Sequence, residues 1–217
     1  MAFPVTAVLD TFTGTDDTAL PTYSANWKDT SEADLEIKGN SATGTIGGNC
    51  SNYWDTAYGP DSEVYATMAT KSPNGEALVL ALRVTTPAGP RNSYDLVIAP
   101  QAATDLFWIQ REDAGVATEL GARMNQEFAS GEKVGLEMIG TTLQAYRHAA
   151  GAWAAMGTTR TDSTYSAAGN LLLYVSDVTV RLDDFGGGTI ASSASPAQYL
   201  PPIYQVGAGG FIGRTSV

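Results

Sequence analysis

Three carboxylates alternate along the segment from Glu32 to Glu36, with Asp34 between the two glutamates. In a β-strand all three would lie on one face, because successive side chains point to opposite faces. Such a group could carry out acid–base chemistry on a glycosidic bond. However, the Cα atoms of Glu32 and Glu36 would be about 13 Å apart at roughly 3.3 Å per residue. A retaining glycosidase needs carboxyl groups about 5 to 5.5 Å apart. The simpler hypothesis is an edge strand whose charges discourage further pairing.

A second candidate site lies in residues 48–58, which interleave aromatic side chains with amides and a carboxylate. We expect this segment to form a loop. Aromatic faces and carboxylates together are typical of sugar recognition. The alternative is that its aromatic side chains close one end of a β-sandwich. The candidate glycan contacts are Tyr53, Trp54, Asp55, Tyr58 and the more distant Trp153.

The composition excludes several classes of function. The net charge of −11 and the absence of a Lys/Arg run argue against nucleic-acid binding. One cysteine, Cys50, excludes an intrachain disulfide, and one histidine, His148, excludes a zinc site built on a histidine pair. We expect no membrane insertion and no export signal, so the protein either stays in the cytoplasm or leaves the cell on a particle released by lysis.

Short alternating apolar segments separated by turn residues recur along the chain and predict β-strands. Residues 77–82 are apolar at every position, as in a central strand buried on both faces. A short turn of helix is expected near residues 122–129, and His148 is expected in an exposed turn. The predicted fold class is all-β, a two-sheet antiparallel sandwich. Its predicted core comprises Val64, Met68, Leu78, Leu80, Leu82, Leu96, Ile98, Leu136, Leu143, Val180 and Leu182, with Trp27 and Trp108 also assigned to the core.

Four motifs, in order, carry a resemblance to a known fold. They are Leu9-Asp10-Thr11-Phe12 with Asn26-Trp27, the hairpin from Gly131 to Tyr146, Thr161 to Tyr165, and Leu182-Asp183-Asp184-Phe185. Together they resemble the laminin-G-like members of the concanavalin A-like lectin/glucanase superfamily. The resemblance implies a jelly roll over residues 1–188. This fold hosts lectins, glucanases and structural modules, so it leaves the function open.

The resemblance adds two hypotheses about sites. The Glu32–Glu36 segment is similar to the E-x-D-x-E signature of laminarinases and lichenases, in which Glu32, Asp34 and Glu36 would be catalytic. If the first and last strands pair, as in the resembling fold, Asp10, Asp183 and Asp184 come together. With Asp16 and Asp17 they offer oxygen ligands for a structural calcium ion. The alternative is that these aspartates only cap turns.

The composition changes after residue 188, because residues 189–217 are rich in Gly, Ser, Ala and Pro yet retain seven large apolar side chains. We expect this arm to pair with a neighbouring subunit. The favoured function is a non-catalytic structural or surface-displayed virion protein, in a phage capsid decoration, fibre or tail. Its expected partners are other virion proteins or itself, as a trimer or another homo-oligomer, and cell-surface glycans. The alternatives are a free lectin module and a glycoside hydrolase.

Overall fold

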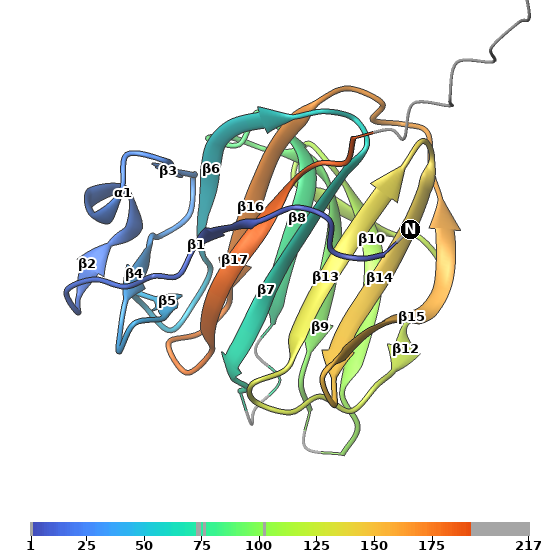
Figure 1. Cartoon of the computed structure of the whole chain (residues 1–217). Coiled ribbons are helices and arrows are strands. Elements are labelled where there is room, and N and C mark those ends of the chain that lie inside the picture. Colours follow the sequence, from blue (N-terminus) through green and yellow to red (C-terminus); the bar gives the residue numbers. More distant parts are fainter. Residues whose placement is uncertain (1, 73–74, 76, 102, 192–217) are drawn as a thin grey trace, which may run out of the picture.

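A computed structural model describes residues 2–72, 75, 77–101 and 103–191. Two antiparallel β-sheets pack face to face in this part of the chain (Figure 1). The only helix among the described residues is α1 (Leu20–Tyr23), a single turn with a proline in its first turn. The predicted antiparallel sandwich is confirmed.

The nine-stranded sheet runs in the order β15-β14-β13-β7-β17-β5-β4-β2, and β1 pairs with β17 beside this path. Its strands are β1 (Val8–Asp10), β2 (Thr18–Ala19), β4 (Leu35–Ile37), β5 (Ala42–Gly44), β7 (Ser62–Thr70), β13 (Lys133–Ile139), β14 (Thr142–Ala149), β15 (Ala152–Thr161) and β17 (Arg181–Thr189).

The eight-stranded sheet runs in the order β11-β10-β9-β8-β16-β6-β3, and β12 pairs with β10. Its strands are β3 (Trp27–Asp29), β6 (Cys50–Tyr58), β8 (Leu78–Thr85), β9 (Asn92–Ala99), β10 (Leu106–Asp113), β11 (Val116–Glu119), β12 (Met124–Asn125) and β16 (Gly169–Val175).

The hydrophobic core lies between the two sheets and follows the alternation of each strand. All eleven residues of the predicted core from Val64 to Leu182 are at most 1% exposed. Strand β8 is buried on both faces, as predicted, because Leu78, Leu80 and Leu82 face the core while Val79 and Ala81 lie under side chains of the outer face. Trp27 lies in the core, whereas Trp108 belongs to a separate cluster on the outer face.

Three local expectations are wrong. Residues 122–129 form no helix, because this segment runs in extended form beside β10, where Met124 pairs with Phe107 and the backbone N–H of Phe128 donates to the buried Asp105. Residues 50–58 form β6 rather than a loop. His148 lies within β14, where it pairs with Trp153 of β15, rather than in a turn.

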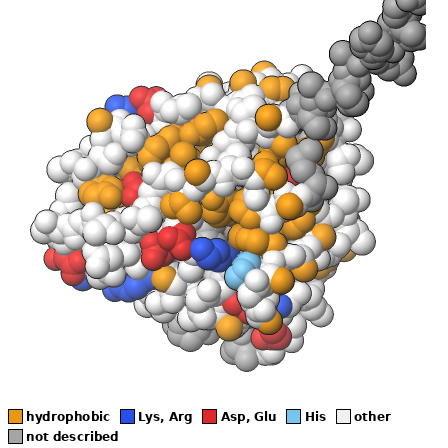
Figure 2. Space-filling model, in the orientation of Figure 1, with side chains coloured by type: hydrophobic (Ala, Val, Ile, Leu, Met, Phe, Trp, Pro, Cys, Tyr) orange, Lys and Arg blue, Asp and Glu red, His pale blue; other side chains and the backbone are white. Residues whose placement is uncertain are grey.

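The N-terminal segment crosses the outer face of the nine-stranded sheet, from β14 toward β17 (Figure 1). Hydrophobic side chains gather on this face around its path (Figure 2). At the other end of the domain, β17 continues to Thr189, and Ile190 is buried with its N–H bonded to the carbonyl of Asp61. The domain thus extends two residues past the expected boundary, and the predicted arm lies outside the described residues from position 192 onward. In the described part, no helix has the length and apolar character that a membrane span requires.

Candidate functional site

A groove with a volume of about 230 Å³ opens on the outer face of the eight-stranded sheet. We call it the Trp108 groove. Apolar and aromatic side chains from four adjacent strands form its floor, and charged and amide side chains form one wall. The lining residues are Glu32, Asn49, Ala77, Val79, Arg91, Val97, Trp108, Gln110, Glu112 and Tyr174.

The floor is a row of four side chains in register across the sheet. Tyr174 of β16 pairs with Val79 of β8, Val79 pairs with Val97 of β9, and Val97 pairs with Trp108 of β10. Adjacent strands are about 4.8 Å apart, so the two aromatic side chains at the ends of the row are separated by about 14 Å. Two valines between two aromatic rings make a flat apolar platform with an aromatic side chain at each end.

Trp108 is held in place from two sides. Its indole N–H donates to Gln110 at 2.8 Å, and the Cζ atom of Arg123 lies 4.0 Å from the centre of its ring. Gln110 in turn donates to the fully buried Asp95 at 3.2 Å. Asp95 also accepts a 2.6 Å hydrogen bond from Ser93. This chain of contacts fixes the orientation of both the indole and the amide.

The wall of the groove is a charge network centred on Arg91. The Nε atom of Arg91 lies 2.5 Å from Glu112, and Nη1 lies 3.9 Å from Glu32. Glu32 also accepts a 2.6 Å hydrogen bond from Ser51. Burial and, to a smaller extent, the neighbouring Asp95 raise the pKa of Glu112 to about 7, against the opposing effect of Arg91. Burial likewise raises the pKa of Asp95. The network therefore changes its charge near neutral pH.

The structure divides the three carboxylates of the Glu32–Glu36 segment between two environments. Only Glu32 reaches the groove, because Ala33 bridges to Cys50 in the eight-stranded sheet while Glu36 lies in β4 of the other sheet. Asp34 accepts a 2.9 Å hydrogen bond from Asn52. The three do not share one strand face, because the strand begins only at Leu35.

The other predicted glycan contacts also diverge. Alternation along β6 sends Trp54 into the core, where it is 7% exposed and meets Trp27 edge-on at 5.3 Å, while Tyr53 lies against the outer cluster. Asp55 pairs with Lys28 at 3.6 Å on the surface. The half-buried Tyr58 packs against the core. Trp153 lies on the other sheet, where it contacts Phe3, Tyr65 and His148.

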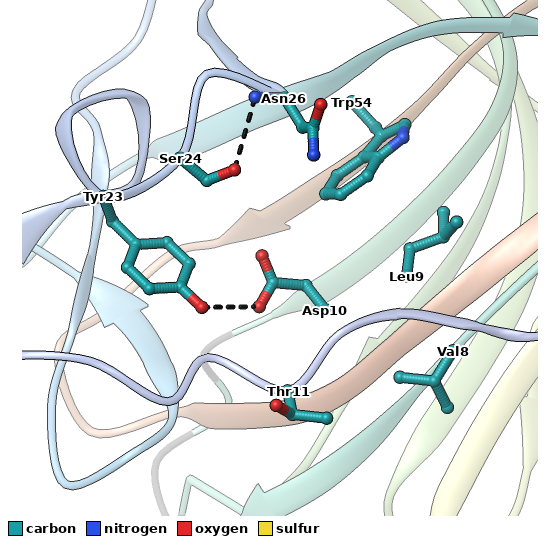
Figure 3. Close-up of a pocket in the computed structure, with 8 residues that line it drawn as sticks. All are labelled: Val8, Leu9, Asp10, Thr11, Tyr23, Ser24, Asn26 and Trp54. Carbon is teal, nitrogen blue, oxygen red and sulfur yellow. Dashed lines mark hydrogen bonds between the residues drawn. The ribbon is translucent and has the colours of Figure 1, made fainter.

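A second cavity, of about 400 Å³, lies beside β1 and is lined by Val8, Leu9, Asp10, Thr11, Tyr23, Ser24, Asn26 and Trp54 (Figure 3). Asp10 accepts hydrogen bonds from the hydroxyl of Tyr23 at 3.1 Å, the indole N–H of Trp27 at 2.8 Å and the backbone N–H of Phe12 at 2.7 Å. These donors already occupy both oxygens of the carboxylate.

The aspartates expected to bind calcium point to separate partners. Asp184 accepts from Lys133 at 2.8 Å and from Thr67 at 3.1 Å, and the side chain of Asp183 accepts from the N–H of Asp184 at 2.7 Å. Asp16 and Asp17 bind the N–H of Gly39 and the ammonium of Lys38. Within the described ranges no group of three or more acidic, histidine or cysteine side chains is placed to hold a metal ion. The calcium site stays a prediction without a ligand cluster to support it.

The sequence analysis did not identify the main residues of the groove, namely Arg91, Trp108, Gln110, Glu112 and Tyr174. A signal for part of the site was present, since Trp108, Gln110 and Glu112 alternate along one strand and so share a face. The sequence did not reveal that this face is the outer one, or that Arg91 and Glu32 lie beside it.

No protein-family model and no curated protein matches the chain. Several solved structures do match the chain. Carbohydrate-binding module CBM66 from Bacillus subtilis is 19% identical, with 75% of this chain and 95% of that chain covered at a TM-score of 0.60. The CBM2 module of the evolved Dit protein of Lactobacillus casei BL23 phage J-1 is 13% identical, with coverages of 79% and 87% and a TM-score of 0.52.

A third similar structure is a prokaryotic β-1,3-1,4-glucanase (lichenase) derived from a mouse hindgut metagenome. It is 10% identical, with 82% of this chain and 96% of that chain covered at a TM-score of 0.51. Identities this low establish a shared fold alone. The two-sheet architecture and these likenesses together show that the chain has the concanavalin A-like jelly-roll fold.

Proposed function

We propose that this protein is a non-catalytic carbohydrate-binding module whose glycan lies in the Trp108 groove. The observation that carries the proposal is the row Trp108–Val97–Val79–Tyr174 beside the Arg91 network. Concave sites lined mostly by apolar and aromatic side chains, with a few placed polar groups, are typical of small-ligand binding. The fold likeness to carbohydrate-binding modules supports the same assignment.

The groove is preorganised for this role. Trp108 is fixed by Gln110 and Arg123 before any ligand arrives, so binding loses little additional side-chain freedom. Sugar C–H groups would pack on the valines and the aromatic side chains, while sugar hydroxyls would donate to Glu32 and Glu112 and accept from Arg91.

The charges of the groove favour a neutral glycan. Glu32, Glu112 and Asp95 all act on Arg91, and the other nearby cation, Arg123, is already paired with Glu119, so the carboxylate of a uronic or sialic acid would meet net negative charge. The net charge of −11 on the whole chain acts in the same direction. We therefore expect neutral hexose or pentose polymers to bind and acidic polysaccharides to be rejected.

A glycan array followed by calorimetric titration of the best hit tests this proposal. Trp108→Ala should weaken binding at least about tenfold, since truncating a well-packed aromatic anchor costs about 2 kcal/mol or more. Trp153→Ala is the matched control, because it removes the same side chain from the outer face of the other sheet. An array without hits, or an equal loss of glycan affinity in both variants, would overturn the proposal.

We further propose that the module acts on the surface of a phage particle, in the tail or on the capsid. The likeness to a module of a phage Dit protein supports this location, as does a chain in which only 16% of the residues are charged. Repetition in a particle would let weak individual contacts add up to firm attachment. Antibody labelling of purified particles in the electron microscope should mark the virion. Labelling confined to the soluble fraction of the lysate would contradict this location and leave glycan binding standing.

The proposal of a non-catalytic role has its own assay, because a glucanase shares the fold. The groove does hold carboxylates, and the proposal of a non-catalytic role rests on the likeness to carbohydrate-binding modules. We expect no reducing sugar to be released from β-1,3 or β-1,4 glucans. If reducing sugar is released and the activity disappears in Glu112→Gln, the protein is an enzyme whose acid lies in this groove. If the activity disappears in Glu32→Gln or Glu36→Gln, the catalytic residues lie in the E-x-D-x-E segment instead.

A further inference from the structure

The outer face of the nine-stranded sheet carries an aromatic slot that the N-terminal segment fills. Gly135 of β13 lies in register between Tyr146 of β14 and Tyr65 of β7. The ring of Phe3 enters the space above this glycine, parallel to the ring of Tyr146 at 4.1 Å and edge-on to Trp153 at 4.9 Å. A Cβ atom at position 135 would lie 2.4 Å from the ring of Phe3, so the slot exists because this residue is glycine.

A buried carboxylate holds the segment that follows Phe3. Glu63 of β7 has no exposed surface. Its Oε1 atom accepts hydrogen bonds from the backbone N–H of Val5 at 2.7 Å, the N–H of Thr6 at 2.6 Å and the hydroxyl of Thr6 at 2.6 Å. The hydroxyl of Tyr65 adds a 3.0 Å bond to the carbonyl of Thr6. Four hydrogen bonds therefore attach residues 5 and 6 to the sheet, three of them through a single oxygen.

The second oxygen of Glu63 presents an electrostatic problem. Glu63 lies directly opposite Glu137 of β13, which is 8% exposed. Directly opposed residues of an antiparallel pair have Cβ atoms about 5 Å apart. Among the described residues, neither Oε2 atom has a hydrogen-bond partner. Two ionised carboxylates so close and so buried would repel each other strongly, and one proton between them removes the repulsion and satisfies both oxygens.

We propose that Glu137 is protonated in the folded protein and donates to the Oε2 atom of Glu63, and that this pair is a pH-sensitive latch that keeps the N-terminal segment on the aromatic slot. With the proton present, the pair carries a single negative charge, which the donors on Val5 and Thr6 compensate. Loss of the proton adds a second charge beneath the segment. The segment and the pair then separate to let water reach the carboxylates, which uncovers Tyr65, Tyr146 and Trp153.

The groups around the pair set the direction of its response. The pKa of Glu137 is raised, mainly by burial and also by the carboxylate of Glu63. The hydroxyl of Tyr146 and the amino terminus of the chain act in the opposite direction but do not cancel this rise. On β17, Asp184 is engaged by Lys133 of β13, so this lysine already has a partner of its own. His148 of β14 pairs in register with Lys133 and packs on Trp153, away from the carboxylates.

The sign of the pH effect follows from the raised pKa. A proton bound more tightly in the latched state stabilises that state at low pH, and this contribution is lost as the pH rises above the ordinary glutamate value of 4.5 and through the raised value of Glu137. We therefore expect the segment to be held in acid and released progressively toward alkaline pH.

Amide hydrogen exchange of Val5 and Thr6, corrected for intrinsic rates, measures the latch directly. In the full chain we expect protection of both amides to fall with rising pH, by up to about tenfold per pH unit once the proton on Glu137 is being lost. Glu137→Gln should make this protection independent of pH, because its amide supplies a permanent donor to Glu63. Glu63→Gln should lower protection at every pH, since the charged acceptor is gone.

Glu36→Gln is the matched control, because Glu36 lies in the same sheet on β4 and should leave the pH profile unchanged. The wild-type profile stands as a test even if a variant fails to fold. Protection of Val5 and Thr6 that stays constant between pH 4 and pH 9, or that varies equally in Glu137→Gln, would overturn the latch. Neither result depends on whether the Trp108 groove binds a glycan.

Discussion

The two outer faces of this sandwich carry the same types of side chain, but one face is open and the other is covered. Both place two aromatic side chains in one row across neighbouring strands with smaller residues between them, and both set carboxylates beside the row. On the eight-stranded sheet the carboxylates surround Arg91 and the row lines an open groove. On the nine-stranded sheet neither Glu63 nor Glu137 forms an ion pair with another described residue, and the N-terminal segment covers the row.

The difference shows what charge compensation does for a surface site. A carboxylate paired with arginine can remain at the wall of an open groove, where it is available to a ligand. An unpaired buried carboxylate needs donors from elsewhere, and here the chain supplies them from Val5 and Thr6. The same residue types thus give a binding platform on one face and a covered surface on the other.

Removing the cation of the groove should have the largest effect. Arg91→Ala leaves Glu32, Glu112 and the buried Asp95 without their positive partner, and breaking such a pair typically costs about 3 to 5 kcal/mol. Because the Arg91 side chain is 13% exposed, we expect about 3 kcal/mol in urea unfolding at pH 8. Lys28→Ala, which breaks an exposed pair with Asp55, should cost at most about 1 kcal/mol. Equal losses of stability in the two variants would show that Arg91 does not compensate the negative charges of the groove.

The second-largest effect on stability is expected from the ionisation of Glu112 in the groove. The folded pKa of Glu112, raised by burial and by Asp95 to about 7, lies above the ordinary value of 4.5. This contribution to stability is complete below pH 4.5 and is lost as the pH rises through 7, with a slope of at most about 1.4 kcal/mol per pH unit. The free energy of unfolding measured with urea should be about 2 kcal/mol lower at pH 8 than at pH 5. Glu112→Gln should abolish most of it, and an unchanged slope in that variant would place the titrating group elsewhere.

Filling the slot on the other face should produce a smaller loss. Gly135→Ala puts a methyl group against the ring of Phe3 and 2.9 Å from the carbonyl oxygen of Val64. Overpacking costs about 1 kcal/mol at the lower end of its usual range, and we expect this value because Phe3 lies on the N-terminal segment and can shift. The double variant with Phe3→Ala should lose less than the sum of the two single variants, because one clash has been removed. Strict additivity in thermal or urea unfolding would mean that Phe3 does not occupy the slot.

The smallest effect is expected at a surface residue of β6. Asp55→Ala removes a carboxylate that pairs only with the exposed Lys28 and lies outside the Trp108 groove. Glycan affinity should change less than about twofold, and stability by less than about 0.5 kcal/mol. A loss of affinity as large as that of Trp108→Ala would support the sequence-based prediction that Asp55 contacts the ligand.

Much of the fold could be predicted from the sequence because its signals are local. Strand β7 alternates Val64, Ala66 and Met68 with polar partners, and this period of two is the geometry of a half-buried strand. Strand β15 gave no such signal, because its small residues around Trp153 are mostly exposed at the sheet edge. The expectation of a helix at residues 122–129 failed since Asp105 binds that segment in extended form, a contact between distant parts of the chain.

The candidate site depended on tertiary structure for the opposite reason. The sequence determined many of the strands, the core between the sheets and even the shared face of Trp108, Gln110 and Glu112. It could not determine that this face lies outside the sandwich, or that Arg91 and Glu32 meet there. Alternation assigns side chains to one of two faces, whereas strand order and crossovers decide which distant residues become neighbours on that face. The segment from Glu32 to Glu36 shows the consequence, since five consecutive residues pass from one sheet to the other and separate carboxylates that the sequence alone placed together.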